Sequence, residues 1–142
     1  MNGVRCGLLI CYDVRFPELY REYHLDDVRL MLHSFHNARQ SPDAIHPMIM
    51  PVSLQTRAAT NNMFVSATNS CAPESWPALL ATPDGRIAAR LPANKPGILM
   101  SLIDAERKFY DASAPYRRRA IQGTLNSGET VDDPRSKNRR SR

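Results

Sequence analysis

Residues 4–18 read VRCGLLICYDVRFPE, and they combine the signals of a strand, a sharp turn and the start of a helix. Val4–Cys11 is rich in apolar residues but short, which is typical of a mostly buried strand rather than a helix. A helix follows, because Pro17 suits a first helical turn and Glu18 places an acid near the positive end of that helix. Val28–Ser34 is a second apolar run of strand length. Strand, sharp turn, helix and strand form a βαβ unit, so the sequence predicts parallel pairing and an α/β fold.

The next part of the chain alternates helix and strand. The pattern is helical from Pro42 to Asn62, and Val52–Asn61 is its firmest stretch. Pro47 and Pro51 are expected to break or kink the first part of this helix. Further strands are predicted at Met63–Thr68, Ala78–Thr82, Arg86–Leu91 and Ile98–Ile103. The turn signal Pro83-Asp84-Gly85 joins two of them into a hairpin.

The C-terminal part carries weaker signals. Asp104–Phe109 can cap and begin a short helix, whereas Pro115 and the run Arg117–Arg119 favour irregular chain. Beyond about Gly123 the residues are too polar to bury enough surface to offset the entropy lost on ordering. We therefore expect one domain over residues 1–123 and a disordered basic tail over residues 124–142.

The composition excludes several classes of protein. With 42% hydrophobic and 23% charged residues, the chain of 142 residues has the profile of one soluble globular domain. Its apolar runs are far shorter than the ~20 residues of a membrane-spanning helix, and the N-terminus has no secretory cleavage pattern. The three cysteines, Cys6, Cys11 and Cys71, lack the spacing of a disulfide framework. We expect a cytoplasmic protein with reduced thiols and no membrane contact.

The positive charge lies in the tail. Of the 19 basic residues, five follow Pro134, and the remaining 14 balance the 14 acidic residues. A net charge of +5 therefore does not indicate a basic face on the folded part. RNA binding through the tail stays a minor alternative, and we expect no nucleic-acid partner.

Cys11 is the first candidate for chemistry. It lies at the junction of the predicted strand and helix, where a sharp turn exposes a side chain and backbone N–H groups favour the thiolate over the thiol. The same N–H groups could hold the oxyanion of a tetrahedral intermediate. On the pattern alone, a thiol that ends an apolar strand is more typical of packing than of catalysis, because cysteine is among the most buried residue types.

The residues around Cys11 closely resemble the nucleophile segment of the nitrilase superfamily of carbon–nitrogen hydrolases. The resemblance begins in Gly7–Leu19 and continues in Arg57–Val65, which is similar to the family's Arg-Ala-x-Glu-Asn helix and the strand after it. Asn69 stands where that strand usually ends in Asn. Ser75 and Thr82–Arg86 look like the family's Ser and Pro-Asp-Gly hairpin. The resemblance runs to about Arg119; Thr60 in place of the usual Glu is a departure.

The resemblance implies the C-terminal part of a four-layer α-β-β-α sandwich that hydrolyses amides, nitriles or carbamoyl groups. Family members use a Glu, a Lys and a Cys, and the first two precede the Cys along the chain. The half that should carry them is missing from this sequence, because Cys11 is only ten residues from Met1. Two interpretations stay open: a hydrolase chain completed by another segment or partner, and a truncated, noncatalytic remnant. A half-sandwich would also expose a sheet face, so we expect a homo-oligomer, dimer or higher.

Other site residues follow from the same interpretation. Cys11 would be the catalytic nucleophile, and the backbone N–H of Tyr12 would join the oxyanion hole. Arg15 resembles a position that contacts substrate carboxylate in some relatives, although a surface role fits equally well. His36 and Asn37 follow the second parallel strand, the edge where α/β sheets gather ligands. The substrate would be a small amide, nitrile or carbamoyl compound.

No cofactor is expected, and metal binding is a minor alternative. It would use His33, His36 and His46, whose spacing includes no carboxylate or thiol. Asp13 is expected to accept a hydrogen bond that braces the turn, and Trp76 to belong to the core or to line a pocket.

Overall fold

The computed structural model describes residues 3–41 and 43–121. The chain divides into two compact units, Met1–Asp111 and Ala112–Arg142. The first unit holds the sheet and every candidate site residue. In the second unit, the described residues form one helix, α3 (Ala114–Ile121).

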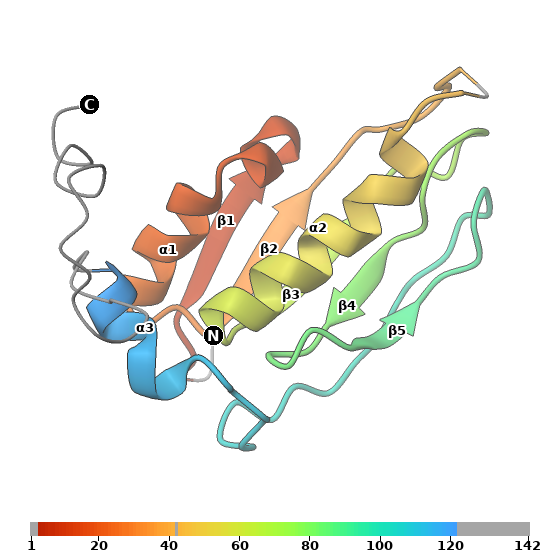
Figure 1. The fold of residues 1–142 in the computed structure, drawn as a ribbon. Helices are drawn as coiled ribbons and strands as arrows, with labels where there is room; N and C mark the ends of the chain where they lie inside the picture. Colours follow the sequence, from red (N-terminus) through yellow and green to blue (C-terminus); the bar gives the residue numbers. More distant parts are fainter. Residues whose placement is uncertain (1–2, 42, 122–142) are drawn as a thin grey trace, which may run out of the picture. The chain divides into compact units, whose positions relative to one another are not determined.

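A five-stranded mixed sheet organises the first unit, with strand order β1-β2-β3-β4-β5 (Figure 1). The strands are β1 (Cys6–Ile10), β2 (Leu30–Ser34), β3 (Phe64–Thr68), β4 (Leu79–Ala81) and β5 (Ile87–Arg90). The first three strands run parallel, and β4 and β5 continue the sheet antiparallel. The carboxyl ends of β1, β2 and β3 therefore meet at one edge. The predicted βαβ unit and hairpin are confirmed.

Two helices cover one face of this sheet (Figure 1): α1 (Pro17–Leu25) and α2 (His46–Asn61). Both begin with a proline in the first turn, where the missing N–H leaves no hydrogen bond unmade. Of the break or kink predicted at Pro51, the break is absent, because α2 continues through it. Its buried residues Met50, Leu54 and Ala58 recur every four positions, so packing against the sheet outweighs the lost backbone bond.

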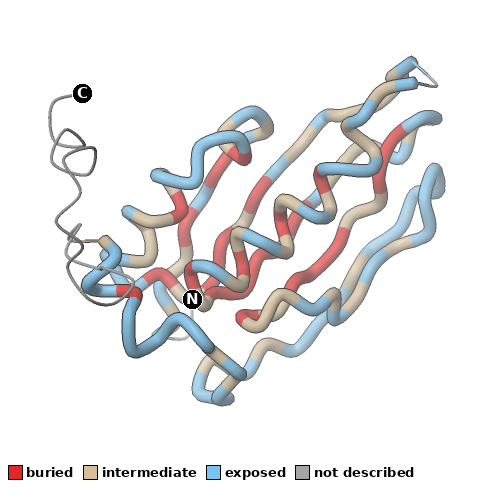
Figure 2. The backbone as a smooth tube through the Cα atoms, in the orientation of Figure 1, coloured by how far each residue is buried: buried red, intermediate tan, exposed pale blue. Residues whose placement is uncertain are grey.

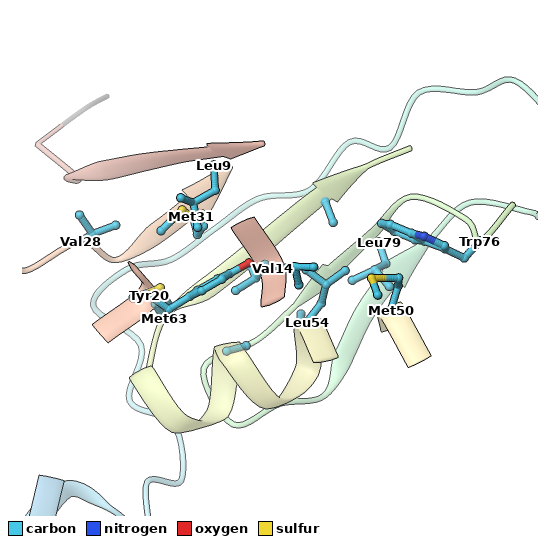
Figure 3. Close-up of a cluster of buried hydrophobic side chains, with 14 residues drawn as sticks. Leu9, Val14, Tyr20, Val28, Met31, Met50, Leu54, Met63, Trp76 and Leu79 are labelled. Carbon is cyan, nitrogen blue, oxygen red and sulfur yellow. The ribbon is translucent and has the colours of Figure 1, made fainter. Parts of the chain in front are cut away.

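The main core lies between the sheet and these helices. Figure 2 shows burial concentrated in the strands and on the inner sides of α1 and α2. Tyr20, Leu54 and Val65 are completely buried, and Trp76 is confirmed as a core residue at 1% exposure. Figure 3 shows the side chains of this buried cluster, which come from strands of the sheet and from both helices. Burying each large apolar side chain contributes roughly 1.5–3 kcal/mol, which anchors the strand ends that carry the site.

The opposite face of the sheet is only partly covered. A smaller cluster of Leu30, Phe64 and Leu80 packs there against residues from the segment 99–109. Beyond this cluster, Leu8 and Ile10 of β1 are each 70% exposed. The residues of β1 alternate in burial as a strand with one covered face requires.

The structure corrects the predictions for the C-terminal elements. The predicted strand at Ile98–Ile103 and the predicted helix at Asp104–Phe109 are both absent from the described chain. The side chains of Leu99, Ile103 and Phe109 instead pack on the outer sheet face. Their apolar pattern therefore reflects side-chain packing and not hydrogen bonding as a strand. The irregular chain expected around Pro115 is a helix, because proline is tolerated in a first helical turn. The predicted tail, 124–142, lies outside the described residues.

No helix in the described part of the chain is both long enough and apolar enough to cross a membrane.

Candidate active site

Cys11 stands at the end of β1, where the chain turns out of the sheet. It has a positive φ of 45°, which is uncommon for a residue with a side chain and costs about 1–3 kcal/mol. A short 3-10 helix, η1 (Cys11–Arg15), begins at this residue. The thiol is free and only partly buried. The strand-to-helix turn predicted for Cys11 is therefore present, and its backbone is strained.

Asp13 stabilises this turn with two hydrogen bonds. Its carboxylate oxygen Oδ2 accepts a hydrogen bond from the backbone N–H of Ile10 at 2.9 Å. The Asp13 carbonyl accepts a second bond from the N–H of Phe16 at 3.1 Å. A charged acceptor strengthens such a bond, so Asp13 braces the residues on both sides of Cys11. Its carboxylate therefore has a structural role and is not free to act as a base.

Arg57 supports the same turn from α2. Its Nε and Nη2 atoms donate to the carbonyl oxygen of Val14 at 3.3 and 3.1 Å. Its guanidinium also lies 5.8 Å from the centre of the Tyr20 ring. Two donors in a fixed fork hold the carbonyl more firmly than a single lysine ammonium could. The sequence identified Arg57 only through the family resemblance, since the contact spans 43 residues.

A buried polar pair joins α1 to β2. The Tyr20 hydroxyl and Nδ1 of His33 are 2.5 Å apart, and both side chains are almost fully buried. Burial lowers the pKa of His33 from 6.5 to about 4, while the Cys11 backbone and Asp13 act in the opposite direction. Burial raises the pKa of the Tyr20 phenol above its ordinary value, opposed by Arg57. Both groups are therefore neutral at physiological pH.

Asn69 joins the loops that follow β2 and β3. Its Oδ1 accepts the backbone N–H of Asn37 at 2.8 Å, and its Nδ2 donates to the Asn37 carbonyl at 3.1 Å. The Nδ2 group also donates to the Trp76 carbonyl at 2.8 Å. This amide side chain therefore links the loop after β2 to the loop after β3 at the carboxyl edge of the sheet. Among the described residues, the buried Oδ1 of Asn37 has no hydrogen-bond partner.

The remaining predicted residues lie on the surface around this edge. Tyr12 and Arg15 are exposed, and Nη2 of Arg15 lies 3.2 Å from Nε2 of His46 at the start of α2. His36 is exposed after β2. In the part of the chain that the structure describes, no three His, Cys, Asp or Glu side chains are grouped to hold a metal ion. The three histidines considered above therefore do not form a cluster.

A pocket of about 450 Å³ lies beside the ends of β3 and β4. Its walls combine Thr68 and Asn69 with apolar residues of the segment 91–99, and they include Cys71 and Lys95. Cys11 is not among the residues that line it. The strained backbone of Cys11 and the hydrogen bonds of Asp13 and Arg57 lie at the turn after β1 and not at this pocket.

The sheet, its carboxyl edge and the braced cysteine turn define an α/β protein with a candidate site where the parallel strands end. Residues 1–108 match the carbon–nitrogen hydrolase family, and the chain belongs to this family. A curated relative, "Hydrolase in pqqF 5'region" of Pseudomonas protegens, is 33% identical over 94 residues, covering 62% of this chain and 31% of the relative.

Solved structures of the nitrilase superfamily share the fold. An amidase from Nesterenkonia sp. is similar with a TM-score of 0.63 and 24% identity, covering 88% of this chain and 45% of the amidase. A variant of the amidase from Nesterenkonia sp. AN1 is similar with a TM-score of 0.61 and 26% identity, covering 88% and 46%. That variant carries the acetamide moiety of fluoroacetamide, added covalently at its active-site cysteine. The present chain thus spans about a third of the curated relative and less than half of these amidases.

Proposed function

We propose that this chain supplies the nucleophile half of a carbon–nitrogen hydrolase, with Cys11 attacking an amide, nitrile or carbamoyl carbon. The observation that carries the proposal is the placement of a free, partly exposed thiol on a strained turn at the carboxyl edge of a parallel sheet. Family membership and the covalent adduct at the cysteine of a similar amidase support the choice of this thiol.

The proposed reaction passes through a thioester. On an amide, the Cys11 thiolate adds to the carbonyl carbon, and the oxygen becomes an oxyanion that the backbone N–H of Tyr12 helps to hold. The C–N bond then breaks, the amine leaves with a proton, and a thioester remains on Cys11. Water attacks the thioester carbon, releasing the carboxylic acid and regenerating the thiol. No cofactor takes part in these steps.

Two functional groups must come from outside the residues at the turn. Attack by a thiol needs a base to accept its proton and a cation to stabilise the oxyanion. Asp13 does not fit the role of base, because its carboxylate already accepts the Ile10 N–H. In the family these roles belong to a Glu and a Lys. We propose that a second segment, in the same or a partner polypeptide, brings them against the carboxyl edge of the sheet, as the C-terminal-half interpretation requires.

The loops after β2 and β3 would form part of the substrate pocket. The exposed His36 and the half-buried Asn37, which follow β2, would contact a polar substrate there. Arg15 is exposed beside the turn and could pair with a carboxylate on the substrate, in competition with its contact to His46. These groups favour a small polar substrate over a purely apolar one.

Fluoroacetamide tests the nucleophile on the chain as it exists. We expect its acetamide group to attach to Cys11 faster than to Cys71, and peptide mass spectrometry locates the adduct. Cys71 is the internal control because it is the more exposed thiol, so simple accessibility would label it first. Preferential labelling of Cys71 would remove Cys11 from the mechanism.

Turnover is tested on a chain completed with the segment that carries the Glu and Lys. A panel of amides, nitriles and carbamoyl amino acids is screened by release of ammonia or acid. We expect Cys11→Ala to abolish turnover with folding intact and Cys71→Ala to leave turnover unchanged. If no completing segment or partner restores turnover, the noncatalytic remnant is the better interpretation.

A further inference from the structure

The pocket of about 450 Å³ beside the ends of β3 and β4 is separate from the turn that carries Cys11. Its volume lies in the range of small-molecule sites, which is roughly 300–1,000 Å³. Of the described residues that line it, Lys95 alone carries a formal charge, since neither Asp nor Glu is among them. Within the described chain, Lys95 also has no carboxylate at ion-pair distance. The pocket therefore offers a positive charge that no acidic group neutralises.

Two hydroxyl groups of β3 lie in the same pocket. Alternate side chains of a strand share a face, and Phe64 packs in the apolar cluster on the outer face of the sheet. Ser66 and Thr68 therefore share that face with Phe64, and both line the pocket. Neither is buried, in contrast to Val65 and Ala67 on the inner face. Hydroxyl groups donate hydrogen bonds, so they add to the affinity of the pocket for anionic oxygens.

The loop that carries Lys95 has little conformational freedom. Asn94 before it has a positive φ of 58°, and Pro96 after it restricts Lys95 to extended backbone. The loop is closed at its base, where a Cβ atom on Gly97 would lie 3.3 Å from Cδ2 of Leu91. Leu91 is itself anchored to the chain before β4, because its N–H donates to a carbonyl there at 3.0 Å. Little further ordering of the backbone is therefore required when the Lys95 ammonium binds an anion.

A buried serine joins this loop to the opposite wall of the pocket. Ser75 is 8% exposed, and its Oγ atom lies 2.9 Å from the Ser70 carbonyl oxygen and 3.3 Å from Oδ1 of Asn94. Ser70 follows β3 and Asn94 follows β5, and both line the pocket. Asn69 beside Ser70 is fixed by its own bonds to the loop after β2. The walls are thus held together by the protein without a ligand.

We propose that this pocket binds a small carboxylate that has an apolar tail. The Lys95 ammonium and the hydroxyls of Ser66 and Thr68 hold the carboxylate oxygens through charge-assisted hydrogen bonds. The tail lies against Leu91 and Leu99, which line the pocket as well. One cation among apolar walls matches a singly charged ion better than a doubly charged phosphate. Because Cys11 is not part of this pocket, the site is independent of the proposed hydrolysis.

Backbone ¹H–¹⁵N NMR on the full chain tests the site with sodium hexanoate as the probe and 1-hexanol as its uncharged analogue. We expect hexanoate to shift the amide signals of residues 66–71 and 94–99. We also expect it to bind at least roughly tenfold more tightly than 1-hexanol, as charge-assisted hydrogen bonds imply. Equal affinity for the two probes, or no shift within residues 66–71 and 94–99, would overturn the proposal.

Two variants test the groups that hold the carboxylate. We expect Lys95→Gln to weaken hexanoate binding roughly tenfold or more and to leave 1-hexanol binding unchanged. Lys108→Gln is the matched control, because Lys108 is exposed and does not line the pocket. Thr68→Val keeps the shape of the side chain without its hydroxyl, and it should also weaken hexanoate binding. Equal losses in the two lysine variants would mean that net charge alone acts, which contradicts a site at Lys95. Circular dichroism establishes that each variant is folded.

Smaller anions separate the carboxylate from its tail. Sodium acetate and sodium phosphate should bind this pocket more weakly than hexanoate, because they leave Leu91 and Leu99 without contact. If either binds as tightly, the apolar walls contribute nothing and the proposed class of ligand is wrong.

Thiol labelling separates this pocket from the proposed active site. Cys71 lines the pocket, so saturating hexanoate should slow its labelling by fluoroacetamide and leave the labelling rate of Cys11 unchanged. Protection of Cys11 in place of Cys71 would place the carboxylate at the turn after β1 and exclude a second site. Preferential labelling of Cys71 in the absence of hexanoate would contradict the proposed nucleophile and leave the carboxylate site standing.

Discussion

Arg57 shows how a single side chain can hold a site together across a long sequence separation. Its guanidinium donates twice to the Val14 carbonyl and lies over the Tyr20 ring. Removing it leaves a partly buried carbonyl without a partner and takes away a cation–π contact of the kind worth ~0.5–1 kcal/mol. The turn that carries Cys11 therefore depends on a residue from α2.

We expect Arg57→Leu to lower the free energy of unfolding by about 1–3 kcal/mol, as measured by urea denaturation. Arg86→Leu is the matched control, because Arg86 is exposed and its ion pair with Asp84 at 3.3 Å lies at the surface. An exposed pair contributes at most about 1 kcal/mol. Equal losses in the two variants would mean that the Val14 contact carries no special weight.

From the sequence, the residues near Cys11 and the sheet edge of His36 and Asn37 could be predicted, but the side-chain contacts between helices and strands could not. The strand end and the following turn placed Cys11, Asp13 and Arg15 in one segment, since adjacency needs no tertiary information. The hydrogen bond between Tyr20 and His33 was not predicted, because a lone histidine in an apolar strand gives no sign of its partner. The contact between His33 and Tyr20 depends on how α1 crosses the sheet, which periodicity does not specify.

At the scale of elements, the β4–β5 hairpin is attached to α2 through a glycine. Gly85 has a φ of +83°, and a Cβ atom there would lie 3.1 Å from the Cβ of Ala59 and 3.2 Å from the Gln55 carbonyl oxygen. The Gln55 side chain also donates to the Gly85 carbonyl at 2.8 Å. The turn residue is thus selected both by its backbone conformation and by the close approach of the helix.

We expect Gly85→Ala to destabilise the chain by about 1–3 kcal/mol, combining backbone strain with crowding. Gly3→Ala separates the two causes, because Gly3 also has a positive φ, +78°, but a Cβ there meets nothing within 4 Å. Thermal unfolding of both variants provides the comparison. A Gly3→Ala loss as large as that of Gly85→Ala would show that crowding against α2 contributes nothing.

Elements with local signals were predicted well, and those formed by tertiary contact were not. The βαβ unit and the hairpin follow from short apolar runs and turn residues, and the structure has both. Ile98–Ile103 has the same apolar content as a strand, yet it binds the sheet through side chains and joins no ladder. Pro51 would break an isolated helix, but α2 is held against the sheet by its buried face. In each case packing overrode local preference.

At the scale of the whole molecule, the buried neutral His33 couples stability to pH. Its pKa is about 4 in the folded chain and about 6.5 in the unfolded one, so the unfolded chain binds more protons between these values. Stability contributed by this group is therefore complete above pH 6.5 and declines as the pH falls toward 4. The Asp13 carboxylate and the Cys11 backbone reduce the shift without reversing it.

We expect the urea midpoint of the unaltered chain to fall between pH 7 and pH 4.5 by more than that of His33→Gln, whose side chain does not titrate. The comparison of the two pH slopes removes the contribution of all other titrating groups, because both chains share them. Parallel slopes would show that His33 is protonated at similar pH in the folded and unfolded chains.

The outer face of the sheet is the other whole-molecule property with a measurable consequence. Leu8 and Ile10 on β1 are each 70% exposed, and Leu102 is fully exposed on the segment that crosses this face. Apolar surface of this kind favours association, and burying one leucine is worth roughly 1.5–3 kcal/mol. We therefore expect the chain on its own to self-associate through this face, and Leu8→Lys to weaken the association roughly tenfold or more.

Light scattering across a concentration series measures that change. Leu25→Lys at the end of α1 is the matched control, since Leu25 is 54% exposed but belongs to a helix on the other side of the sheet. If association uses the outer face, only Leu8→Lys shifts the apparent mass toward that of one chain. If the two variants behave alike, the exposed residues of β1 do not make the contact. A chain that is monomeric at every concentration would exclude association through either face. It would show that the folded chain tolerates exposure of Leu8 and Ile10 to water.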